Sequence, residues 1–211
     1  MKLTLRVLTA IAMLAFALPS LGAAQTGDPG PLLKRMAQVN PKLRSYSAQT
    51  HVNIALHSFP FLAPSLDGTV YYRQPDKQAI VFDTVPALAA QFQKIYPKFD
   101  PPSEWDALYT ISIQAADATA TTLRLVPRKA GRVSHLDVRV DNATAMPSDY
   151  TWTYTDGGAV TFEQQYLQID GNYLVKSQAG RVDLPSYKAD VTSTFTNYKL
   201  NVPIPDTVFQ S

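Results

Sequence analysis

Hydrophobic and polar residues alternate along most of the chain after residue 44. In the stretch 45 to 57, one phase of the alternation carries Tyr46, Ala48, Thr50, Val52, Ile54 and Leu56. The other phase carries mainly polar side chains, including two histidines. A period of two is typical of a strand with one buried face. The pattern therefore predicts a long half-buried strand at this point.

The same alternation recurs in shorter segments along the rest of the chain. Strands are expected at 69–72, 79–83, 108–114, 121–126, 133–140, 149–155, 160–169, 172–177 and 186–200. Short turn signals separate them, among them Asp67-Gly68, the segment 74–77, Asp170-Gly171-Asn172 and Ala179-Gly180. Many short strands joined by tight turns indicate antiparallel hairpins, ten or eleven strands in all.

Helical spacing interrupts this pattern in two places. Leu32, Met36 and Val39 lie at steps of four and three, which predicts a short amphipathic helix that ends before Pro41. The segment 86–97 begins and ends with proline and spaces Leu88, Phe92 and Ile95 on one helical face. A further helical turn is expected near 103–107.

These elements predict a mainly β (α+β) protein with a single curved antiparallel sheet. Ten strands in one sheet tend to curl, and two or three short helices are enough to cap the hollow of a half-open barrel. We expect the hollow to be apolar. Its expected lining comprises Tyr46, Val52, Ile54, Leu56, Tyr72, Phe82, Tyr109, Ile111, Ile113 and Trp152. For the aromatic members, packing within the sheet remains the alternative interpretation.

The first 24 residues differ from the rest of the chain. Lys2 and Arg6 precede an apolar run from 7 to 18, and small residues follow at 22–24. This order is typical of a secretory signal peptide, with cleavage after Ala24 as the first choice and after Ala23 as the second. A retained membrane anchor is the alternative. We expect one domain, 25–211, in the periplasm.

Charge and cysteine content narrow the classes of function. The chain has 19 Lys plus Arg and 17 Asp plus Glu, so loss of Lys2 and Arg6 leaves 17 of each and no net charge. A nucleic-acid partner is not expected, because such proteins present a basic excess to phosphates. The chain has no cysteine, which excludes disulfides, thiol catalysis and an acylated N-terminal cysteine.

Few residues are candidates for metal binding or catalysis. His51 and His57 share a strand phase but lie roughly 20 Å apart, too far to hold one ion. The third histidine, His135, lies on the polar phase of its strand. The sequence has no Gly-x-Ser-x-Gly elbow, and most acidic residues fall in turns, where they bond local backbone. We expect no catalytic residue, metal site or cofactor, and a protein that is not an enzyme.

Three segments in order carry a family resemblance. They are LRSYSAQTHV at 43–52, GTVYYRQP at 68–75 and NYKLNVPIPDTVF at 197–209. With the inserted helix between the second and third, the chain resembles the LolA-like superfamily of exported lipid and lipoprotein carriers. The resemblance implies a half-open barrel over a cavity for acyl chains. It also implies that an arginine at a strand end holds a lid, a position that Arg73 matches. The family pattern places proline directly after this arginine, whereas Gln74 intervenes here.

The resemblance implies a carrier that holds the acyl chains of a lipoprotein or another lipid and transfers them across the cell envelope. Arg73, Leu88, Phe92 and Ile95 are then the lid residues. A membrane donor or acceptor transport protein is the expected second partner, and the carrier is expected to be a monomer. An envelope sensor module that binds lipid or a protein partner is the alternative function.

Overall fold

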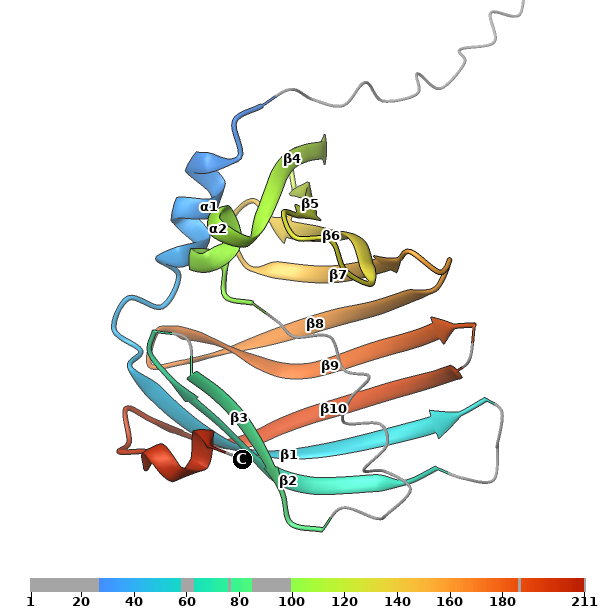
Figure 1. The fold of residues 1–211 in the computed structure, drawn as a ribbon. Coiled ribbons are helices and arrows are strands. Elements are labelled where there is room, and N and C mark those ends of the chain that lie inside the picture. The colour runs from blue at the N-terminus through green and yellow to red at the C-terminus, as the bar shows by residue number, and fades with distance from the viewer. Residues whose placement is uncertain (1–26, 58–62, 76, 85–99, 186, 211) are drawn as a thin grey trace, which may run out of the picture.

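The computed structural model describes residues 27–57, 63–75, 77–84, 100–185 and 187–210. Within them the protein is one ten-stranded antiparallel sheet with short helices (Figure 1). The strands are β1 (Ser45–Leu56), β2 (Ser65–Arg73), β3 (Lys77–Phe82), β4 (Tyr109–Ala116), β5 (Ala120–Pro127), β6 (Val133–Asp141), β7 (Pro147–Tyr154), β8 (Ala159–Ile169), β9 (Asn172–Leu184) and β10 (Tyr187–Leu200). The predicted signal peptide and the predicted helix 86–97 with Leu88, Phe92 and Ile95 lie outside these residues.

The sheet is assembled from a three-stranded and a seven-stranded meander that meet at the β1–β10 pair. Its strand order is β3-β2-β1-β10-β9-β8-β7-β6-β5-β4, so the first strand pairs with the last. The two edges, β3 and β4, lie at opposite ends of this order, and the sheet curves without closing (Figure 1). The predicted fold class, a curved antiparallel sheet that forms a half-open barrel, is confirmed, with ten strands.

The core lies on one face of the sheet, which we call the inner face. Directly opposed residues follow this face through eight strands in the order Leu56, Ala189, Val182, Val160, Trp152, Leu136, Leu125 and Ile111. Opposed residues of an antiparallel pair point to the same side, so these side chains form one continuous band. All but the half-buried Ile111 are buried.

Short helices complete the core. Helix α1 (Gly30–Ala37) buries Leu33 and Met36 in the same cluster as the inner face. A 3-10 turn, η2 (Pro102–Glu104), leads into α2 (Trp105–Leu108), whose Trp105 is 1% exposed and donates its indole N–H to the Asp100 carbonyl at 2.8 Å. No helix in the described ranges has the length and apolar character needed to cross a bilayer.

The buried face of α1 differs from the predicted one, because Leu33 takes the place of Leu32. Leu32, Met36 and Val39 were the expected stripe, whereas Leu33 and Met36 are buried and Leu32 and Val39 pack only at the margin. The helix ends at Ala37, so Val39 no longer continues the helical face. The predicted helical turn near 103–107 is confirmed by η2 and α2.

Two predicted turns are wrong, and both contain a glycine with a packing role. Gly68 lies inside β2, where a Cβ would come 2.5 Å from the Val81 carbonyl oxygen. Gly180 lies inside β9, where a Cβ would come 2.4 Å from the Phe162 ring. In both strands the absence of a side chain allows a neighbouring strand or ring to approach closely.

The turn predicted at Asp170-Gly171-Asn172 is confirmed for its first two residues, and Asn172 is the first residue of β9. Asp170 has φ 50° and Gly171 has φ 74°, and the two residues alone join β8 to β9. Positive φ at both central residues defines a type I′ turn, whose twist matches that of the flanking strands.

We expect Gly180→Ala to lower the free energy of unfolding by about 1–3 kcal/mol, because the added methyl group overlaps the Phe162 ring. Urea denaturation followed by circular dichroism measures the effect. Gly131→Ala is the matched control, since a Cβ at Gly131 would meet nothing within 4 Å. Equal midpoints for the two variants would contradict the packing role of Gly180.

Candidate functional site

The inner face is the candidate site, because it gathers the residues that the sequence marks as a lining. Every predicted lining residue in the described ranges lies on it. Val52, Ile54, Leu56 and Trp152 are buried members of the core, and Tyr46, Tyr72, Phe82, Tyr109, Ile111 and Ile113 are half-buried. The half-buried group falls near the two edges of the sheet, on β1 to β3 and on β4. Their contact with a ligand stays a prediction.

The inner face carries no formal charge. None of the described positions that the strand pairing assigns to it is an Asp, Glu, Lys or Arg. An ionised group held there would have no opposite charge to compensate its loss of water. The face therefore suits an uncharged, largely apolar ligand.

Trp152 belongs to the packed centre of this face. Its ring stacks on Tyr150 with centroids 5.4 Å apart and meets Phe162 edge-on at 6.0 Å. Trp152 is 3% exposed and Tyr150 is 8% exposed, and burial raises the pKa of the Tyr150 hydroxyl. For these two residues, sheet packing is the interpretation that the structure supports.

A tyrosine cluster lies at one end of the inner face, formed by Tyr46, Tyr72, Tyr166 and Tyr198. The Tyr46 ring stacks on Tyr72 at 5.3 Å and meets Tyr198 edge-on at 5.4 Å. Burial, with a smaller contribution from Tyr72, raises the pKa of Tyr46 to about 12. Burial also raises the pKa of Tyr166 and of Tyr198, so these three hydroxyls stay protonated at physiological pH.

Two hydroxyls of this cluster are held by backbone groups. The Tyr198 hydroxyl donates to the Val175 carbonyl at 2.6 Å. The Tyr166 hydroxyl lies 2.5 Å from the Pro147 carbonyl oxygen and 2.6 Å from Oε1 of Gln164. The cluster thus combines apolar ring faces with fixed hydroxyls. Sequence reasoning identified only Tyr46 and Tyr72, because Tyr166 and Tyr198 join them through strand pairing and not through sequence spacing.

Arg73 lies on the opposite, outer face. It is paired with Ser45 on one side and Lys77 on the other, one position beyond the inner-face Tyr72. Its guanidinium donates to the Ile204 carbonyl at 2.9 Å and forms an ion pair with Asp206. The hydrogen bonds described for Arg73 thus go to the C-terminal segment. Its predicted role in holding a helical lid stays a prediction.

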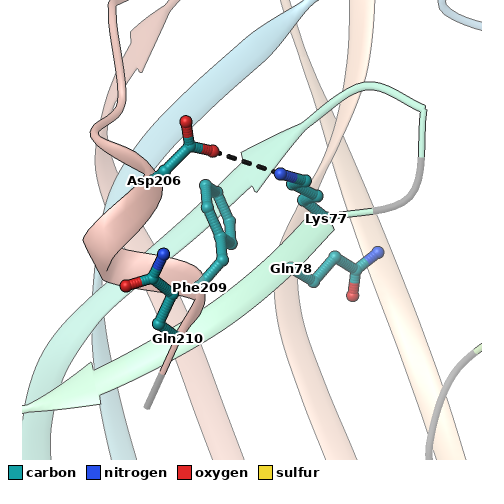
Figure 2. A pocket seen from close by; sticks show the side chains of 5 residues that line it. All are labelled: Lys77, Gln78, Asp206, Phe209 and Gln210. Carbon is teal, nitrogen blue, oxygen red and sulfur yellow. Dashed lines mark hydrogen bonds and ion pairs between the residues drawn. The ribbon is translucent and has the colours of Figure 1, made fainter.

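The contacts around Arg73 form a unit that we call the C-terminal clamp: Arg73, Lys77, Asp206 and Phe209. Lys77 Nζ lies 3.1 Å from Asp206 Oδ1, and the Arg73 guanidinium carbon lies 5.0 Å from the centre of the Phe209 ring. Lys77, Asp206 and Phe209 line a pocket of about 520 Å³ between β3 and η3 (Asp206–Phe209). Figure 2 shows these side chains around it. Sequence reasoning missed this partnership, because Asp206 follows Arg73 by more than a hundred residues.

Further hydrogen bonds hold the chain that leads to the clamp. Asn201 N–H donates to the Ser45 carbonyl at 2.8 Å, and the Ser45 hydroxyl donates to the Val202 carbonyl at 2.6 Å. Ser45 and Ile204 are each 6% exposed. The C-terminal segment therefore lies along the start of β1 and the β2–β3 hairpin, where it covers part of the outer face.

Each histidine lies beside a carboxylate, and none shares an ion site. The pairs are His51 with Asp67 at 2.7 Å, His57 with Asp190 at 2.8 Å and His135 with Asp137 at 3.7 Å. In the described part of the chain, no three His, Asp or Glu side chains are grouped so that they could hold a metal ion. These pairs lie on the polar phases of their strands, away from the inner face.

Comparison with solved structures identifies the fold. A protein of the DUF1329 family from Desulfovibrio piger superposes with a TM-score of 0.65 and 16% identity, over 85% of this chain and 94% of that one. A LolA superfamily protein from Nitrosomonas europaea gives 0.62 and 11%, over 87% and 98%. A domain from Vibrio parahaemolyticus assigned to outer membrane lipoprotein sorting gives 0.65 and 10%, over 86% and 97%.

No protein-family model and no curated protein sequence matches the chain. At these identities the likeness defines the fold alone. The fold is a half-open barrel similar to that of the LolA superfamily structure, and the predicted resemblance is confirmed at the level of fold.

Replacement of Arg73 by alanine should loosen the C-terminal segment, because the variant loses the bond to Ile204, the ion pair with Asp206 and the contact with Phe209. We expect roughly tenfold faster amide exchange over residues 202–209. Hydrogen–deuterium exchange measures it. Arg132→Ala is the control, since that arginine also has an aspartate and a tyrosine ring as neighbours but is 74% exposed at its side chain. Unchanged exchange in Arg73→Ala would disprove the clamp.

The clamp should weaken in acid. Hydrogen bonds from Arg73 and Lys77 lower the pKa of Asp206 below 3.8, its unperturbed value. A carboxyl with a lowered folded-state pKa stabilises the fold fully above the unfolded pKa, and it loses that contribution as pH falls through the folded pKa. We expect the protection factors over 202–209, which are exchange rates relative to those of an unfolded peptide at the same pH, to fall below about pH 4. In Asp206→Asn this pH response should be smaller, and an undiminished response would assign it to another group.

Proposed function

We propose that the protein is an exported carrier that binds the acyl chains of a lipoprotein or another lipid against the inner face and transfers them across the cell envelope. The observation that carries the proposal is the continuous, uncharged inner face of an unclosed sheet, with half-buried apolar side chains near both of its edges. We further propose a periplasmic monomer that receives its cargo from one membrane partner and delivers it to another.

The chemistry of an acyl chain fits this face. Each CH₂ group contributes about 0.8 kcal/mol when it moves from water into an apolar environment, so a carrier must shield most of the chain. A face without charge can do so without leaving an ion uncompensated. The aromatic and aliphatic side chains of Tyr72, Phe82 and Ile111 offer the contacts that an acyl chain makes best.

The unclosed sheet also fits release. Neither edge strand, β3 nor β4, is fixed to the other by backbone hydrogen bonds. A closed barrel fixes the volume that it encloses, whereas the distance between two free edges can change without the loss of a strand ladder. A carrier needs such adjustment, because it must admit acyl chains of different lengths and give them up again.

Native mass spectrometry of the protein purified from its own cell envelope tests the proposal. We expect masses of bound acyl lipid on the folded protein, released in denaturing conditions. Addition of acylated peptide or phospholipid vesicles to the empty protein should restore such masses. Protein that stays empty after both treatments would overturn the proposal.

Ile111→Gln should weaken the binding of an acyl probe roughly tenfold, because a polar side chain replaces an apolar one on the inner face. Ile111 is half-buried, so we expect the variant to fold. Thr110→Gln is the control, since Thr110 is exposed on the outer face of the same strand. Titration with a fluorescent fatty acyl probe measures both, and equal losses in the two variants would place the acyl chain elsewhere.

A further inference from the structure

Four neutral hydrogen-bonding side chains form a row across the inner face. They are Thr50 on β1, Ser193 on β10, Gln178 on β9 and Gln164 on β8. Ser193 lies directly opposite Gln178, and Gln178 lies directly opposite Gln164. Thr50 is the diagonal neighbour of Ser193, because the next inner residue of β1, Val52, is the one opposite Ser193.

The row divides the inner face into two halves. On one side lie aliphatic residues, with Val52, Ile54 and Leu56 on β1 and Val191 on β10. On the other side lies the tyrosine cluster, whose member Tyr166 is the next inner residue after Gln164 on β8. Polar character therefore increases along the face in a single direction, from aliphatic residues through the row to the tyrosine hydroxyls.

Thr50 is the most unusual member of the row. Its side chain is buried, with the residue 3% exposed, and its hydroxyl has no hydrogen-bond partner among the residues that the structure describes. The residue opposite it on β2 is Gly68, which the Phe82 ring approaches. A valine of the same shape would fill this position without burying an unpaired hydroxyl, so packing alone does not account for the threonine.

We propose that this row binds the ester linkages of a glycerol-based acyl lipid. The Thr50 and Ser193 hydroxyls and the Gln178 amide N–H groups can donate hydrogen bonds, and an ester carbonyl accepts them. The acyl chains then lie along the aliphatic half and the glycerol faces the tyrosine cluster. This inference rests on the proposed function and names the chemical class of its ligand.

The dimensions of the aliphatic half agree with this orientation. From Thr50 to Leu56 the strand rises about 20 Å. The hydrocarbon core of a bilayer is about 30 Å thick, so the chains of one leaflet occupy about 15 Å. An acyl chain anchored by its ester at the row therefore fits along β1. The absence of charge at the row favours the neutral ester over an ionised headgroup.

A matched pair of lipids isolates the ester. Dioctanoylglycerol carries two ester carbonyls, and dioctylglycerol has ether linkages in their place with chains of the same length. We expect calorimetric titration to give tighter binding of the diester to the wild-type protein. In Thr50→Val the diester should bind roughly three- to tenfold more weakly, whereas binding of the diether should be unchanged. Ser193→Ala should act in the same direction.

Thr194→Val is the control, because Thr194 is exposed on the outer face of β10. It should leave both affinities unchanged. The urea midpoint of Thr50→Val should equal or exceed that of the wild type, since the variant buries no unpaired hydroxyl. A lower midpoint would contradict the claim that valine packs as well as threonine at position 50.

The outcomes separate the two proposals. A wild-type protein that binds the diether as tightly as the diester, or a ratio unchanged in Thr50→Val, overturns the ester subsite and leaves acyl binding intact. A wild-type protein that binds neither lipid overturns the acyl-carrier proposal itself.

Discussion

The pairing of β1 with β10 holds the whole sheet together. It joins the first three strands to the seven-strand meander that follows, through a ladder that runs from Tyr46–Leu200 to Leu56–Ala189. Without it, β1 to β3 would be a separate three-stranded meander with little core of its own. The ladder also carries the inner face from one half to the other, since Ile54 and Val191 lie opposite each other in it. The register of this ladder also sets the position of Thr50 beside Ser193, and so joins Thr50 to the rest of the row.

The two faces of the sheet differ in the chemistry of their side chains. The inner face has apolar side chains and neutral hydroxyls and amides, whereas the outer face gathers the charged residues into pairs. Arg124 with Asp137 and Lys188 with Asp183, each at 2.7 Å, are examples beside the histidine pairs. The C-terminal clamp belongs to the outer face as well. Arg73 thus stabilises the hairpin that carries Tyr72 and Phe82, although its own side chain points away from them.

Much of the sheet could be predicted from the sequence, because a half-buried strand forces a period of two on its side chains. The alternation from Tyr46 to Leu56 identified both β1 and its buried face. The glycines of β2 and β9 could not be interpreted in the same way. Whether Gly180 ends a strand or admits a ring depends on Phe162, and only the strand register brings those two residues together.

Register also explains which parts of the candidate site the sequence could not predict. The lining residues on single strands were found from their own periodicity. The polar row and the tyrosine cluster require that Thr50, Ser193 and Gln178 be aligned across strands far apart in the sequence. The partner of Arg73 is equally non-local, because a short turn after Pro205 carries Asp206 back to the hairpin. The predicted lid residues Leu88, Phe92 and Ile95 are not among the residues that the structure describes.

The absence of charge on the inner face has a consequence for the response of the molecule to its surroundings. Salt screens the interactions between exposed charges, with a Debye length near 10 Å at 0.1 M and near 3 Å at 1 M. A neutral face offers no charge to screen, so screening does not weaken the binding of an apolar ligand there. The ion pairs of the exposed Asp206 carboxylate, in contrast, are screened. A change in ionic strength would therefore act on the charges of the C-terminal segment and not on any charge of the inner face.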